Sequence, residues 1–149
     1  MKSPLLIGSV ALMLAFQVQA AAPSPERVAE CVAALTTEAE PLAKKSRQGD
    51  AAADAQLTPL VNSAFSFIAS AYKQGVGQAK ADALLAEAKK AQVQMPAQDL
   101  STLQGNCLKE GTLLMANANF IERAIIERAA RARIERLKRS KKTGPAHQP

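Results

Sequence analysis

Residues 107–142 form the longest run of helical spacing in the chain, from the second of two cysteines to a dense block of arginine and lysine. Between residues 108 and 126 this run is apolar around most of its circumference, with Ile121 and Ile125 on one shared face. A helix that is apolar so far round is usually buried against several others. We therefore expect this half to lie inside a helical bundle. The spacing stays in phase further upstream, which predicts one long helix over Asp99–Lys142.

The second half of this run is strongly basic. Residues 122–142 contain nine Lys or Arg and three Glu, a net charge of +6 that equals the net charge of the whole chain. The basic character is therefore local to one helix end, where it favours an anionic partner. We predict that an acidic protein or an anionic envelope surface docks there, on Arg128, Arg131, Arg133, Arg136, Lys138 and Arg139.

A purely structural interpretation of the basic segment stays open. Charges of opposite sign alternate four residues apart, a spacing that stabilises isolated helices by about 0.2–0.5 kcal/mol per pair, at Arg123, Glu127, Arg131, Glu135 and Arg139. Cations also interact favourably with the C-terminal end of the helix dipole. The narrow apolar stripe of this half either packs on the bundle or, if the helix overhangs, forms a helix-in-groove or homodimer contact; its members are Ile126, Ala130, Ile134 and Leu137.

The composition and the residues that favour helix starts and helix ends predict an all-α fold. The chain is rich in alanine, the best helix former, and shows no alternating strand pattern. Ser24-Pro25 is a helix start, Gly49 a helix end, and Pro41 is expected to kink or interrupt the helix between them. Thr58-Pro59 restarts the helical pattern, and a further helix is expected over residues 78–94. We predict a single helical domain over residues 21–142, a small antiparallel bundle of about four helices whose long last helix overhangs the others.

Residues 1–20 have the features of an export signal. Lys2 is followed by an apolar stretch and then by Val18-Gln19-Ala20, a small-x-small cleavage site. We expect cleavage after Ala20 and a periplasmic or secreted protein with no stable membrane span. An uncleaved anchor is the alternative, but the apolar stretch is short for a span. At the other end, residues 143–149 are expected to be a disordered tail.

The two cysteines, Cys31 and Cys107, are predicted to form one disulfide, because exported proteins pass into oxidising compartments. A reactive or metal-binding thiol pair is the alternative, but neither cysteine has a neighbouring histidine or a CxxC spacing. Closing a loop of this length would stabilise the fold by about 4–5 kcal/mol in the chain-entropy model. The bridge would also place the first helix beside the last.

The sequence offers little for catalysis, and we expect no enzymatic activity. The only histidine, His147, lies in the predicted tail, where no scaffold holds it in a reactive geometry. The acidic and methionine residues form no recognisable metal-ligand spacing, so no metal or cofactor is predicted. Nucleic acid fits the basic charge, but the export signal and the absence of interleaved aromatic residues argue against it.

Two short segments give an alternative function. Leu57-Thr58-Pro59 and Leu100-Ser101-Thr102-Leu103-Gln104 resemble the paired LTxxQ motifs of the Spy-like periplasmic chaperones, although Val61 replaces the glutamine of the first and Ser101 a threonine of the second. The resemblance implies a small exported all-α protein that dimerises into a basic cradle and holds unfolded clients without ATP. An interaction protein with a basic docking helix and a holdase of this kind are thus the two candidate functions.

Overall fold

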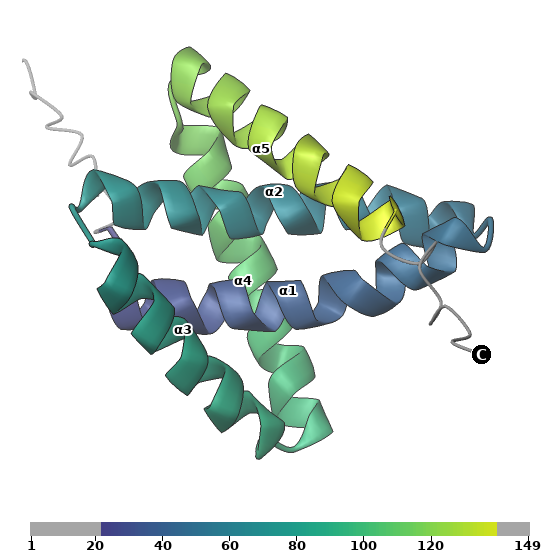
Figure 1. The fold of residues 1–149 in the computed structure, drawn as a ribbon, viewed down its shortest axis with the longest axis horizontal. Coiled ribbons are helices and arrows are strands. Elements are labelled where there is room, and N and C mark those ends of the chain that lie inside the picture. The colour runs from purple at the N-terminus through teal and green to yellow at the C-terminus, as the bar shows by residue number, and fades with distance from the viewer. Residues whose placement is uncertain (1–21, 140–149) are drawn as a thin grey trace, which may run out of the picture.

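The computed structural model describes residues 22–139, which fold into five α-helices without a strand. The predicted all-α class is confirmed, whereas the predicted number of about four helices is wrong by one. The predicted signal peptide, residues 1–20, and the predicted tail, residues 143–149, lie outside the described residues. Figure 1 shows the order of the helices: α1 (Pro25–Arg47), α2 (Ala51–Lys73), α3 (Gln78–Val93), α4 (Ala97–Asn117) and α5 (Phe120–Arg139).

The predicted helix starts and stops around α1 are present. Ser24 caps α1, since its hydroxyl accepts a hydrogen bond of 3.2 Å from the backbone N–H of Arg27. Gly49 adopts the left-handed conformation (φ +91°) just beyond the C-terminal end of α1, where glycine is favoured. The carboxylate of Asp50 then caps α2 by accepting from the N–H of Ala53 at 3.0 Å.

Pro41 does not interrupt its helix, and the predicted restart at Thr58-Pro59 is wrong. α1 continues through Pro41, and α2 begins at Ala51 and continues through Pro59 instead of restarting there. Both prolines lie on exposed faces, so the carbonyl group that loses its helical partner faces water. The opposite faces of both helices are buried and keep the helical backbone in place.

The predicted single helix over Asp99–Lys142 is also wrong, because the chain turns between α4 and α5. The side chain of Asn119 accepts from the N–H of Glu122 at 2.9 Å, and the carboxylate of Glu122 accepts from the N–H of Asn119 at 3.2 Å. This reciprocal capping box satisfies two backbone N–H groups, those of Asn119 and Glu122, at the start of α5. It stabilises a new helix start at a point where the apolar spacing alone predicts continuity.

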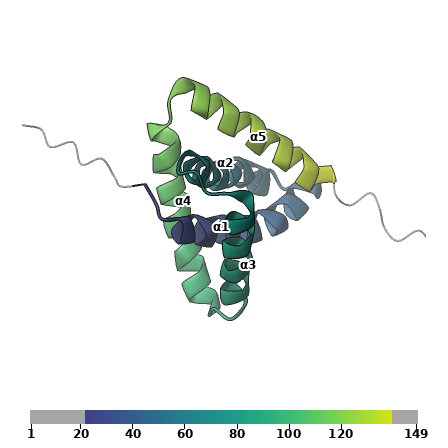
Figure 2. The same cartoon turned by 60° about the vertical axis from the view of Figure 1, so that its left-hand side comes forward.

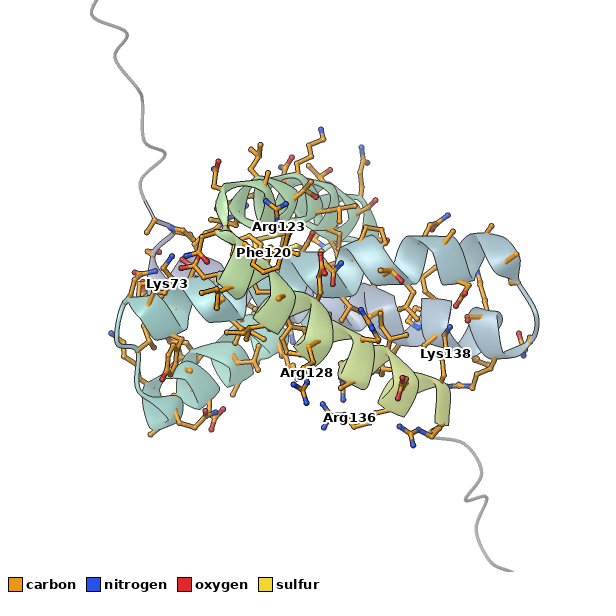
Figure 3. The ribbon with its side chains drawn as sticks, turned by 90° about the horizontal axis from the view of Figure 1, so that it is seen from above. Lys73, Phe120, Arg123, Arg128, Arg136 and Lys138 are labelled. Atoms are coloured by element: carbon orange, nitrogen blue, oxygen red, sulfur yellow. A yellow bond between two sulfur atoms is a disulfide. The ribbon has the colours of Figure 1, made fainter. Side chains whose placement is uncertain are left out.

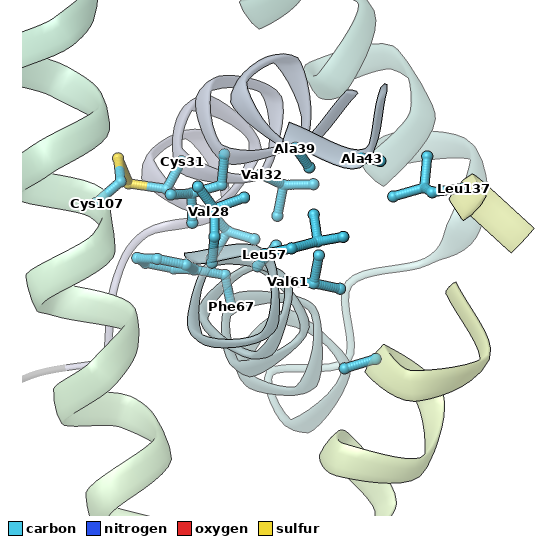
Figure 4. Packing of buried hydrophobic residues seen from close by; sticks show 14 residues of the cluster. Val28, Cys31, Val32, Ala39, Ala43, Leu57, Val61, Phe67, Cys107 and Leu137 are labelled. Atoms are coloured by element: carbon cyan, nitrogen blue, oxygen red, sulfur yellow. A yellow bond between two sulfur atoms is a disulfide. The ribbon is translucent and has the colours of Figure 1, made fainter. Parts of the chain in front are cut away.

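The core lies in the seam between α1 and α2, which pack side by side as an antiparallel hairpin (Figures 1 and 4). Phe67, Leu35 and Leu57 are its largest completely buried apolar side chains. α4 crosses both helices of the hairpin, and α3 packs mainly on α1 at the other side (Figures 1 and 2). The helices therefore do not form the simple antiparallel bundle that we expected, since α4 lies across the hairpin and not along it.

Cys31 of α1 and Cys107 of α4 are joined by a disulfide, as predicted, with their Cα atoms 5.2 Å apart and both residues completely buried (Figure 4). One turn away, the guanidinium of Arg27 bonds the carboxylate of Glu110 at 3.0 Å. A covalent and an ionic contact thus hold α4 against α1 at the same level.

α4 approaches α2 most closely at Gly111. A Cβ atom at this position would lie 2.6 Å from the Cβ of Ser63, closer than such atoms approach in proteins. The absence of a side chain at Gly111 is therefore what allows the two helices to pack this closely. Ser63 is 2% exposed beneath this crossing.

α5 folds back along α2 and does not overhang the other helices. The ion pair Lys73–Glu122 (2.8 Å) joins the end of α2 to the start of α5, and the ion pair Asp54–Lys138 joins the start of α2 to the end of α5. The two helices therefore run in opposite directions. The predicted apolar stripe of α5 packs on the hairpin with Ile126, Ala130 and Leu137 buried and Ile134 partly buried, which settles the stripe as a core contact.

Candidate functional site

All six residues predicted to bind an anionic partner lie on α5. The side chains of Arg128, Arg131, Arg136 and Arg139 are exposed. Arg133 and Lys138 flank the buried stripe and are half-buried. The segment that carries them, residues 128–139, has six basic residues and one acidic residue, a net charge of +5. α3, by comparison, carries three lysines and two acids, so its charge nearly cancels.

Two of the six cations are engaged within the protein. Lys138 pairs with Asp54 of α2, and Arg139 pairs with Glu135 one turn earlier at 3.2 Å. The hydrogen bond from Lys138 lowers the pKa of the Asp54 carboxyl below its ordinary value. These two residues therefore serve to hold α5 in place and to support its last turn.

Of the ion pairs expected along α5, only the pair between Glu135 and Arg139 forms in the described part of the chain. Arg123, the first predicted member, instead donates to the carbonyl oxygens of Ala116 and Ala118 at 3.2 and 3.3 Å. It thus satisfies carbonyl groups at the end of α4, where helical carbonyls lack partners. Within residues 22–139, Glu127 and Arg131 form no ion pair. The structural interpretation of the basic segment consequently accounts for only part of its charge.

The remaining four cations form what we call the arginine row: Arg128, Arg131, Arg133 and Arg136. None of the four side chains has a hydrogen bond or an ion pair with any residue between 22 and 139. Figure 3 shows Arg128 and Arg136 pointing to the same side of α5, away from the hairpin, while Lys138 points to the other side. Because the opposite face of α5 is buried, the helix holds the backbone positions of these arginines at fixed spacing on the surface.

Large apolar side chains are exposed immediately before the arginine row. Phe120, Ile121 and Ile125 are 85%, 68% and 63% exposed. The expectation that Ile121 and Ile125 lie on a buried face is therefore wrong. Because a new helix starts at Asn119, α5 packs on α2 through the stripe that includes Ile126 and Ala130. Ile121 and Ile125 lie on the other side of α5 and therefore face solvent. Sequence reasoning missed this exposed group because it took the segment as one continuous helix.

The hairpin carries a second surface feature, an apolar furrow along the seam between α1 and α2. Two hollows of about 220 and 110 Å³ share Ile68 in their lining. The larger one reaches α3 beside Tyr72 and Leu85, and the smaller one reaches α5 beside Arg133. Ile68 and Tyr72 are exposed, so the furrow is open to solvent beside these two side chains.

The residues quoted for the chaperone resemblance lie within helices. Leu57 and Val61 of α2 are buried in the core, and residues 100–104 belong to the first half of α4. Val61 also lines the smaller hollow of the furrow beside Arg133. Ser101 and Thr102 are exposed on α4, so the two segments do not form one common surface.

Groups suited to metal binding or membrane spanning are not found between residues 22 and 139. No three His, Cys, Asp or Glu side chains in that range are placed to hold a metal ion. None of its helices is long and apolar enough to cross a bilayer. Both cysteines of the chain are in the disulfide.

Comparison of the chain with protein-family models, with curated proteins and with solved structures finds no match. The chemistry of the surface therefore carries the functional argument by itself.

Proposed function

We propose that this chain is an exported, non-enzymatic helical interaction protein whose basic helix α5 docks an anionic partner or surface. The observation that carries the proposal is the arginine row, four arginines within nine residues of one helix. Their charges have no partner among residues 22–139. The neighbouring cations Lys138 and Arg139, by contrast, are already paired.

The chemistry of the arginine row suits an anionic ligand. A guanidinium group presents a planar fork of donors that matches a carboxylate or a phosphate in a bidentate geometry. Arginine is also less strongly hydrated than lysine, so it loses less solvation on docking. The helix backbone fixes the spacing of the four groups, which lowers the entropy lost when a partner binds.

Affinity capture with three forms of the mature chain, residues 21–149, tests the proposal. The first is the wild type, and the second carries Arg128→Gln, Arg131→Gln, Arg133→Gln and Arg136→Gln. The third is a matched control that loses the same charge elsewhere on the surface, by replacement of four lysines with glutamine. These lysines are exposed and form no ion pair among residues 22–139: Lys80, Lys89, Lys90 and Lys109. Each form is immobilised and exposed to an envelope extract.

We expect one discrete set of bound components with the wild type and with the lysine control, and its loss with the arginine variant. Glutamine is nearly as good a helix former as arginine, so circular dichroism should show equal helix content in all three forms. Equal capture by the arginine variant and the wild type would contradict the proposal.

The second candidate function is an ATP-independent holdase of the Spy-like kind. The apolar furrow favours it, because an open apolar surface beside Arg133 could hold unfolded segments that carry acidic residues. This candidate predicts a homodimer and the suppression of aggregation of unrelated clients at substoichiometric or equal amounts. If the protein leaves the aggregation of a chemically unfolded client enzyme unchanged, the holdase function is excluded.

A further inference from the structure

The exposed apolar group at the start of α5 calls for a physical explanation. Phe120, Ile121 and Ile125 lie within six residues and are each more than 60% exposed. Single exposed apolar residues are common on soluble proteins, but a contiguous group next to polar residues marks an interaction site. Its neighbour along the helix is the arginine row.

Two of the exposed apolar residues and two of the arginines, Ile121, Ile125, Arg128 and Arg136, share one side of α5, which we call the outward face. Residues that recur at intervals of three and four lie on the same side of a helix. Ile121, Ile125, Arg128, Ala132 and Arg136 follow this spacing. The buried stripe, which includes Ile126, Ala130 and Leu137, lies on the opposite side. The outward face is thus apolar over its first two turns and basic beyond them.

We propose that the outward face of α5 binds the surface of an anionic lipid bilayer. In this arrangement Ile121 and Ile125 enter the boundary between headgroups and acyl chains, and Arg128 and Arg136 contact lipid phosphates. Phe120 and Arg131, which are exposed at one edge of this face, add an apolar and a basic contact beside them. Basic helices with exposed aromatic and aliphatic side chains bind bilayers in this way, with the helix in the plane of the interface. The inference rests on the proposed function, because it names the anionic surface that the arginine row would meet.

The charges of the outward face decide between a bilayer and a second copy of the chain. A symmetric dimer through this face would bring two sets of unpaired arginines together, which is electrostatically unfavourable. The one acidic residue of α5 that follows Arg128 in the sequence, Glu135, is already paired with Arg139. An anionic bilayer, in contrast, offers phosphates and acyl chains side by side, and it meets the convex side of a single helix without needing a groove.

Co-sedimentation with vesicles of defined composition tests the inference. The mature chain is mixed with vesicles of phosphatidylcholine alone and with vesicles that contain phosphatidylglycerol as the anionic lipid. One variant carries Arg128→Gln, Arg131→Gln and Arg136→Gln, and a second carries Phe120→Ser, Ile121→Ser and Ile125→Ser. The charge-matched control carries Lys80→Gln, Lys89→Gln and Lys90→Gln.

We expect binding to the anionic vesicles only, with weakening as salt screens the charges. Each arginine near such a surface contributes about fivefold in affinity, so the arginine variant should bind roughly a hundredfold more weakly. The serine variant should also lose binding, whereas the lysine control should stay within about tenfold of the wild type. All substituted outward-face residues are exposed, and circular dichroism checks that each variant keeps its helices.

Three results would overturn the inference. The first is the absence of binding to anionic vesicles while capture from envelope extract still depends on the arginine row, which would leave the proposed function intact and identify an acidic protein as the partner. The second is equal binding to both kinds of vesicle. The third is a wild-type dimer that the serine variant converts to a monomer without any vesicle binding, which would show that a second copy covers the apolar group.

Discussion

Replacing Gly111 with alanine tests the crossing of α4 over α2. The added Cβ would lie 2.6 Å from the Cβ of Ser63 and 2.9 Å from both the Cα and the carbonyl oxygen of Ser63. Two of these three contacts are with the backbone of α2, so rotation of a side chain cannot relieve them. α4 must instead move away from α2 by about 1 Å to reach ordinary carbon–carbon separations of about 3.5–4.0 Å.

We expect Gly111→Ala to lower the free energy of unfolding by about 2 kcal/mol. Overpacking a core contact typically costs about 1–3 kcal/mol, and a clash with backbone belongs in the upper part of that range. Alanine is a better helix former than glycine by about 1 kcal/mol, which offsets part of the cost. The disulfide at Cys31 and Cys107 restricts how far α4 can shift, since it ties the neighbouring turn of α4 to α1.

Gly105→Ala is the matched control, because it makes the same change in the same helix where nothing lies within 4 Å. Only the gain in helix propensity applies there, so Gly105→Ala should stabilise the protein by about 1 kcal/mol. Urea unfolding followed by circular dichroism measures both variants against the wild type. If Gly111→Ala is as stable as Gly105→Ala, the close crossing of α4 and α2 is refuted.

Three further predictions concern the contacts that hold the helices together. Replacing Cys31 and Cys107 with serine should lower the free energy of unfolding by about 4–5 kcal/mol for a loop of this length; a loss under about 1 kcal/mol in urea unfolding would contradict it. Asn119→Ala should cost about 1 kcal/mol and speed amide hydrogen exchange in the first turn of α5; unchanged exchange there would argue against the capping box. The ion pairs lower the pKa values of Asp54 and Glu122, so their stabilising effect is present above the ordinary carboxyl pKa and is lost as the pH falls below about 4. Exchange of α5 amides should rise in that acidic range, and less so when both carboxylates are replaced by amides; identical profiles would contradict the role of these pairs.

Local signals in the sequence were sufficient for much of the helical structure. Ser24, Gly49 and Asp50 act within three or four residues of the helix ends that they define, so their effects are readable from neighbours alone. The turn at Asn119 was missed because the apolar residues before and after it keep the same helical spacing, which predicts one continuous helix. The signal for a new helix start is only a capping box of two residues. The crossing of α4 over the hairpin depends on Gly111 meeting Ser63, a contact between distant segments that periodicity does not specify.

The candidate site was predicted as a segment but not as a surface. Net charge identified the basic end of α5, yet its division into paired and unpaired cations depends on contacts such as Lys138 with Asp54, 84 residues away. The exposure of Phe120 and Ile121 could not be read from hydropathy, since it follows from which stripe of α5 packs on α2. Side-chain identity therefore located the charge, and tertiary packing decided which groups remain available to a partner.

Sedimentation of residues 21–149 with an isolated cell-envelope preparation tests most directly whether the arginine row docks an anionic partner. Wild-type chain, the four-arginine variant and the four-lysine control are compared at physiological salt, with the bound fraction measured after centrifugation. The account predicts that wild type and lysine control sediment with the envelope, while the arginine variant stays in the supernatant. Equal bound fractions for all three forms would contradict it.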